Sequence, residues 1–142
     1  MTFRTMITGA VWLAVVPGFA AAEMTAMERA LEAGAKTLGS DEIAETMVGK
    51  TVKWVAASSD KEVLIHYGED NGIEGRLIGG DWTGTGFYGV TTDDRICLSW
   101  DGRDAGRLRC LHVLMIDGTP HKFRADGSES GALERIEDGR NF

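Results

Sequence analysis

The stretch that decides the fold is Arg95-Ile-Cys-Leu-Ser-Trp100-Asp-Gly-Arg-Asp-Ala-Gly106-Arg-Leu-Arg-Cys110-Leu-His-Val-Leu-Met-Ile116. Two segments that alternate in polarity flank a polar turn, and Cys97 and Cys110 lie equally far from the centre of that turn. This spacing places two residues opposite each other on adjacent antiparallel strands. We therefore predict a β-hairpin in which a disulfide bond joins Cys97 to Cys110.

Pairing of the two cysteines also sets the register of the hairpin, so that Ile96 should face Leu111. Because successive side chains on a strand point to opposite faces, alternate residues on both strands should share the core side. The cysteines fall on the other face, beside Arg95 and His112. The residues expected on the core side are Ile96, Leu98, Trp100, Leu111, Val113 and Met115.

The same alternation continues on both sides of the hairpin, with turn residues at short intervals. Asn71-Gly72, Asp117-Gly118 and Asp126-Gly127 are dipeptides typical of tight turns. No helical pattern separates the segments, which argues against a parallel sheet. We predict a mainly β fold, an antiparallel meander that forms a barrel or a strongly coiled sheet. Its eight short strands are expected over residues 51–57, 63–67, 73–78, 82–90, 95–100, 107–116, 119–125 and 131–137.

A helical segment, residues 23–49, should precede the β domain, residues 50–142. The apolar residues Met24, Met27, Leu31 and Leu38 recur at helical spacing and predict a helix from Met24 to Leu38. Ser40 is expected to cap a second, short helix, with acidic residues in its first turn and Gly49 at its end. We expect the N-terminal helix to cover one opening or edge of the sheet.

The first 22 residues have the features of a secretory signal peptide. A basic residue, Arg4, precedes an apolar stretch, and small residues stand at Ala20 and Ala22. Cleavage after Ala22 would leave a chain that is periplasmic or secreted. In such an oxidising compartment an isolated pair of cysteines is usually a disulfide, which contributes on the order of 2–4 kcal/mol.

The chain is acidic, with a formal net charge of −7. Like charges repel at range, so nucleic acid is excluded as a partner and a basic protein is compatible. The apolar stretch lies within the predicted signal and is shorter than the ~20 residues that span a bilayer. Since cleavage would also remove it, no insertion into a membrane is expected.

Gly84-Thr-Gly-Phe-Tyr-Gly89 matches the G-x-G-x-x-G pattern of dinucleotide sites, but no helix follows to bind a pyrophosphate. The segment instead predicts a strand on which Trp82, Gly84, Gly86 and Tyr88 share one face. Missing side chains at the glycines allow coiling or leave room inside a closed sheet. These four residues are therefore the predicted ligand-binding residues, although core packing of the aromatic side chains is the alternative.

No catalytic residues are predicted. Gly127-Ser-Glu-Ser-Gly131 has glutamate where a G-x-S-x-G nucleophile would stand. The three histidines, His66, His112 and His121, lack a second ligand at a metal-binding spacing, so no metal and no cofactor are expected. An enzyme is the least favoured class of function.

Several segments together resemble a family of small exported bacterial proteins that is known only as a domain of unknown function. The resemblance covers most of the chain from Met47 to Glu137, and it implies a location in the cell envelope without assigning an activity. The segments that carry it are Met47–Trp54, Gly79–Gly84, Asp94–Trp100, Leu108–Leu111 and Phe123–Gly127.

The order of elements along the chain is more distantly similar to that of lipocalin-like and avidin-like barrels. This order is a helix, a glycine, a strand that carries a tryptophan, and then a meander. Here Gly49 and Trp54 are separated by four residues, in place of the Gly-x-Trp of lipocalins. The disulfide hairpin is also similar to that of small periplasmic inhibitor barrels. These similarities concern architecture, which does not fix function.

The leading hypothesis is a non-enzymatic binding module for a small apolar ligand or an envelope component. The alternative is a protein-interaction module that inhibits, or protects against, a hydrolase such as lysozyme or a protease. In that alternative the acidic turns at Glu69-Asp70 and Asp93-Asp94 would contact a basic enzyme.

Overall fold

The computed structural model describes residues 14–15, 17–18 and 21–142. The signal peptide predicted over residues 1–22 falls mostly outside these ranges. The helices in the described part of the chain lack the length and hydrophobicity of a transmembrane span.

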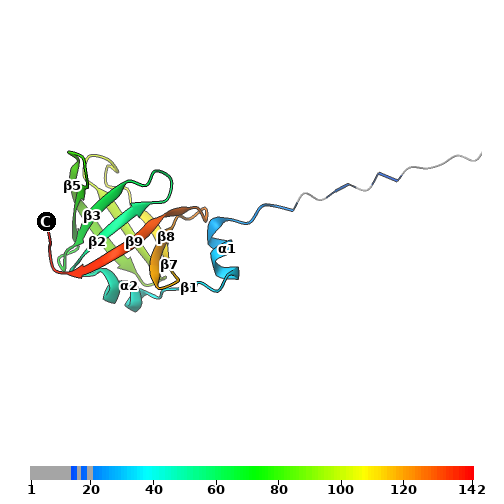
Figure 1. Cartoon of the computed structure of the whole chain (residues 1–142), viewed down its shortest axis with the longest axis horizontal. Helices are drawn as coiled ribbons and strands as arrows, with labels where there is room; N and C mark the ends of the chain where they lie inside the picture. Colours follow the sequence, from blue (N-terminus) through cyan, green and yellow to red (C-terminus); the bar gives the residue numbers. More distant parts are fainter. Residues whose placement is uncertain (1–13, 16, 19–20) are drawn as a thin grey trace, which may run out of the picture.

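Eight antiparallel strands form a closed barrel in which each strand pairs with the next in sequence, and the last pairs with the first (Figure 1). The predicted antiparallel meander is thus confirmed, and of its two expected forms, a barrel or a strongly coiled sheet, it adopts the barrel. The strands begin and end within a few residues of the predicted positions. The strands are β2 (Lys50–Ala56), β3 (Glu62–Tyr67), β4 (Gly72–Leu77), β5 (Thr83–Thr91), β6 (Arg95–Trp100), β7 (Arg109–Ile116), β8 (Thr119–Phe123) and β9 (Glu129–Asp138).

The hairpin of β6 and β7 has the predicted register. Ile96 pairs with Leu111 and Cys97 with Cys110, and the disulfide is formed, with the two cysteine Cα atoms 4.0 Å apart. Alternate side chains point into the barrel as expected, and Met115 is only partly buried there. The other predicted core residues of this hairpin, Ile96, Leu98, Trp100, Leu111 and Val113, are all buried.

The predicted helix from Met24 to Leu38 is wrong in its second half. Helix α1 spans only Ala26–Glu32 and has no buried residue, and Gly34 follows it at φ 98°. Lys36–Thr37 then forms a short strand, β1, which pairs with Leu114 and Met115 of β7. Strand β6 pairs only with the first part of β7, so the unpaired backbone groups of the second part are free to bind β1.

The second helix, α2, spans Ser40–Met47, so Ser40 is its first residue and not its cap. Gly39 is the N-cap, and the Glu42 carboxylate accepts a hydrogen bond from its N–H at 2.9 Å. The exposed N–H of Ser40 donates to Asp94 Oδ1 at 2.7 Å, from the loop between β5 and β6. Gly49 stands just after the helix at φ 74°, as expected of a residue that terminates it.

Helix α2 closes one end of the barrel (Figure 1). It contacts β2 on one side and β5 and β6 on the opposite side, and Ile43 and Met47 are completely buried in the core. Next to this end, Tyr67 and Tyr88 pack edge to face with their ring centroids 5.0 Å apart. The apolar core therefore fills the half of the barrel near α2.

Candidate functional site

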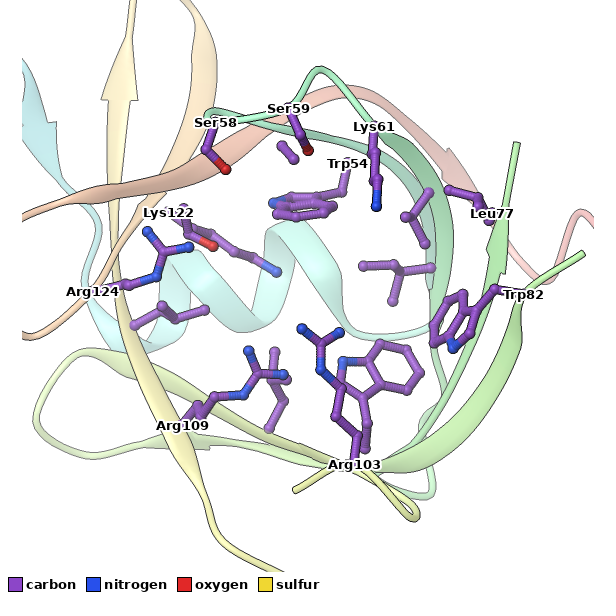
Figure 2. A pocket seen from close by; sticks show the side chains of 17 residues that line it. Trp54, Ser58, Ser59, Lys61, Leu77, Trp82, Arg103, Arg109, Lys122 and Arg124 are labelled. Carbon is purple, nitrogen blue, oxygen red and sulfur yellow. The ribbon is translucent and has the colours of Figure 1, made fainter. Parts of the chain in front are cut away.

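A cavity of about 460 Å³ occupies the half of the barrel away from α2, and Figure 2 shows its lining. An eight-stranded barrel is just wide enough to be filled by side chains or to hold one small ligand. The volume is within the range of small-molecule sites in proteins. The lining residues are Trp54, Ala56, Ser58, Ser59, Lys61, Val63, Ile65, Leu77, Trp82, Leu98, Trp100, Arg103, Arg109, Leu111, Lys122, Arg124 and Ser130.

One wall of the cavity consists of two indole rings. Trp82 and Trp100 pack edge to face, with ring centroids 5.4 Å apart and planes 77° apart. They lie over Gly75 and Gly84, which pair with each other across β4 and β5. A Cβ on Gly75 would stand 2.8 Å from Trp100 and 2.9 Å from Trp82, so the indoles occupy space that only glycine leaves free.

Replacing Gly84 by alanine should therefore displace the Trp82 ring. The new Cβ would lie 2.6 Å from that ring, and Trp82 is 38% exposed, so it can move toward solvent. We expect loss of the exciton couplet of the Trp82–Trp100 pair in circular dichroism and a red shift of tryptophan emission. Gly89→Ala is the matched control on the same strand, because a Cβ there meets nothing within 4 Å. An unchanged couplet in Gly84→Ala would contradict the packing described.

Five of the other lining residues carry positive charge. Lys61, Arg103 and Arg124 come from the loops β2–β3, β6–β7 and β8–β9 at the open end. Arg109 and Lys122 come from the strands β7 and β8, and Figure 2 shows their nitrogen atoms directed into the cavity. Among the described residues, the lining includes no aspartate or glutamate. An acidic protein thus encloses a cationic cavity.

Lys122 is the least exposed of these cations, at 2%. Its Nζ donates a hydrogen bond to the hydroxyl of Tyr67 and lies 4.9 Å from the centre of that ring. Burial, together with the positive charge of Arg109, lowers the pKa of Lys122 from 10.5 to about 7. Burial likewise raises the pKa of Tyr67, so the phenol stays neutral beside the amine.

Arg109 is held in place by Asp104, a carboxylate from the β6–β7 turn. Asp104 Oδ2 accepts hydrogen bonds from Arg109 Nη2 at 3.0 Å and from the backbone N–H of Trp100 at 2.8 Å. Burial opposes ionisation of Asp104, but the Trp100 N–H and the charges of Arg109 and Arg103 outweigh it and lower the pKa. The carboxylate therefore stays charged and fixes both a cation and the tryptophan backbone of the cavity.

Of the four predicted ligand-binding residues, Trp82 lines the cavity. Gly84 lies beneath its ring, whereas a Cβ on Gly86 would overlap the carbonyl oxygen of Ser99, so the glycine permits close approach of β5 and β6. Tyr88 lies at the closed end, 4% exposed, and donates a hydrogen bond to the Gly68 carbonyl at 2.8 Å. The structure thus brings Trp82 and Gly84 together at the cavity and places Tyr88 in the core.

Of the five cationic residues, only Lys122 has a local signal in the sequence, because alternation along β8 places this charged residue at an inward position. Lys61, Arg103 and Arg124 stand in loops, where a basic residue is ordinarily solvated. In the part of the chain that the structure describes, no three His, Cys, Asp or Glu side chains are grouped as metal ligands.

Comparisons of the chain with protein-family models, with curated proteins and with solved structures give no match.

Proposed function

We propose that this protein is a non-enzymatic binding module that holds a small, largely apolar molecule in the open half of its barrel. The observation that carries the proposal is the cavity of about 460 Å³ in the lumen, lined by Trp54, Trp82 and Trp100. A concave site with aromatic walls and a few convergent polar groups is the usual form of a small-molecule site.

The entrance of the cavity supports the same function. Trp82 lines the cavity and is 38% exposed, so part of its indole ring is in contact with solvent at the mouth of the barrel. An apolar ligand can contact this ring before it is fully desolvated inside the lumen.

We place the module outside the cytosol, in the periplasm or as a secreted protein. The disulfide between Cys97 and Cys110 supports this location, because such bonds persist in oxidising compartments. The features of residues 1–22 support export by a signal peptide. The up-and-down strand order supports the proposed similarity to lipocalin-like barrels.

Titration with N-phenyl-1-naphthylamine tests the binding function, because this neutral probe fluoresces only in an apolar environment. We expect saturable binding of one probe per barrel and transfer of excitation energy from the cavity tryptophans to the probe. Gly84→Ala should weaken binding and Gly89→Ala should not. Absence of saturable binding by the folded, oxidised protein would overturn the proposal.

The alternative, a module that binds a hydrolase through acidic turns, stays a prediction. Two of its carboxylates are engaged within the chain: Asp94 accepts from Ser40 and Asp93 pairs with Arg95. Assays of lysozyme and of secreted proteases with excess protein test it directly, and inhibition would favour it over ligand binding.

A further inference from the structure

We propose that the ligand of the cavity is an organic anion, whose acidic group pairs with Lys122 and Arg109 while its apolar body lies against Trp82 and Trp100. This inference rests on the proposed binding function and specifies the chemistry of the ligand. The acidic group is a carboxylate or a sulfonate, since both present oxygen acceptors on a compact anion.

The first argument is the charge of the lining. Five cationic side chains surround one small volume, and among the described residues no carboxylate belongs to that lining. Asp104 contacts Arg109 from the adjoining turn and compensates part of this charge. Of the five, Lys122 is buried and the other four are exposed. Because a buried charge is screened far less than an exposed one, Lys122 attracts an anion more strongly than it would in water, and the exposed cations add a weaker attraction at the mouth.

The second argument is the depth and the free donors of Lys122. An ammonium group has three N–H donors, and among the described residues Tyr67 Oη is the one acceptor recorded for it. An amine at 2% exposure with donors facing a cavity gains hydrogen bonds when an oxygen anion enters. Arg109 also faces this space, with one Nη committed to Asp104. An anion between these two residues would be held by charge-assisted bonds.

The third argument is the position of the apolar wall. Figure 2 shows Trp82 across the cavity from Lys122, and Trp100 packs against Trp82. Trp82 is partly exposed whereas Lys122 is buried, so the aromatic wall extends to the mouth. A ligand that enters with its acidic group first leaves its apolar body on the indoles, where burial of apolar surface is favourable.

Binding of an anion should also depend on pH. The pKa of about 7 means that the Lys122 amine is charged at pH 6 and mostly neutral at pH 8.5. The groups that share this space with Lys122 are Tyr67 from β3, Arg109 from β7, and Lys61, Arg103 and Arg124 from the loops. Affinity for an anion should therefore fall as the pH rises, and affinity for a neutral ligand should not.

The test compares two probes that share one aromatic skeleton. 8-Anilinonaphthalene-1-sulfonate carries a sulfonate, and N-phenyl-1-naphthylamine is the neutral parent. We expect the sulfonate to bind at least about 10-fold more tightly at pH 6, the value of one charge-assisted hydrogen bond, and to lose this advantage in part at pH 8.5. Decanoate should displace it at lower concentration than decanol.

Lys122→Met should weaken sulfonate binding by about 10-fold or more and abolish its dependence on pH, with little effect on the neutral probe. Lys36→Met is the matched control, since Lys36 is an exposed lysine on β1 outside the cavity. If Lys122→Met fails to fold, the pH dependence of sulfonate binding by the unaltered protein still tests the proposal, because that measurement needs no variant.

The two proposals fail differently. Equal affinity for the sulfonate and the neutral probe at both pH values overturns the anionic ligand and leaves the binding function standing. Equal losses in Lys122→Met and Lys36→Met also overturn it, because the effect would then be one of overall charge. If neither the sulfonate nor the neutral probe binds, both proposals are overturned.

Discussion

Replacing Lys122 by methionine is expected to change how the stability of the protein depends on pH. The folded state holds the amine at a pKa of about 7, and the unfolded chain at the ordinary 10.5. Between these values the unfolded chain binds one more proton, so Lys122 makes the folding free energy more favourable as the pH rises. The variant lacks this contribution. The difference in unfolding free energy between the two proteins should shift by about 1.4 kcal/mol per pH unit above pH 7.

Urea unfolding at pH 6, 7, 8 and 9 measures this difference. Below pH 7 the amine is charged in both states, and methionine should be favoured because it removes a desolvated charge. Loss of the hydrogen bond to Tyr67 adds a cost that does not vary with pH over this range. Lys36→Met, at an exposed lysine, should show a constant difference. A constant difference for Lys122→Met as well would mean that the amine is well solvated.

Removal of the disulfide is expected to have the other large effect. The bond closes a loop with a sequence separation of 13, for which restriction of the unfolded chain predicts a contribution of about 3 kcal/mol. The doubly substituted Cys97→Ala, Cys110→Ala protein should be less stable by about this amount in urea unfolding. The loss should also widen the β6–β7 hairpin, where regular pairing already ends at Leu98 and Arg109.

A reductant supplies the control for this prediction. It should destabilise the native protein by a similar amount and leave the double variant unchanged, because that variant has no other cysteine. Equal stability of the oxidised and reduced native protein would contradict a structural role for the bond. A change in the double variant on adding reductant would point to an effect unrelated to cysteine.

The disulfide lies next to the cationic part of the cavity. Arg109 is next to Cys110 on β7, and Asp104 holds Arg109 from the turn that the disulfide closes. The disulfide therefore also constrains the turn that supplies Arg103 and Asp104 to the site.

Residue patterns alone predict the antiparallel meander of eight strands and the register of the disulfide hairpin, and they leave a closed barrel and a strongly coiled sheet as alternatives. These follow from local signals: alternation of polarity, turn dipeptides such as Asn71-Gly72, and the equal spacing of Cys97 and Cys110 about one turn. The end of α1 was not predicted from such signals, because the helical spacing of its apolar residues continues to Leu38. Lys36–Thr37 instead forms a strand, because it pairs with backbone groups of β7 that β6 leaves unpaired.

The composition of the site depends on how the barrel closes. Closure of β9 on β2 brings Lys61, Arg103 and Arg124 from separate loops around one cavity, and α2 fills the opposite end, so that Tyr88 became core and Trp82 a lining residue. Charge around a cavity is a sum over residues far apart in sequence. The period of a single strand carries no information about which loops share an end of the barrel once it has closed.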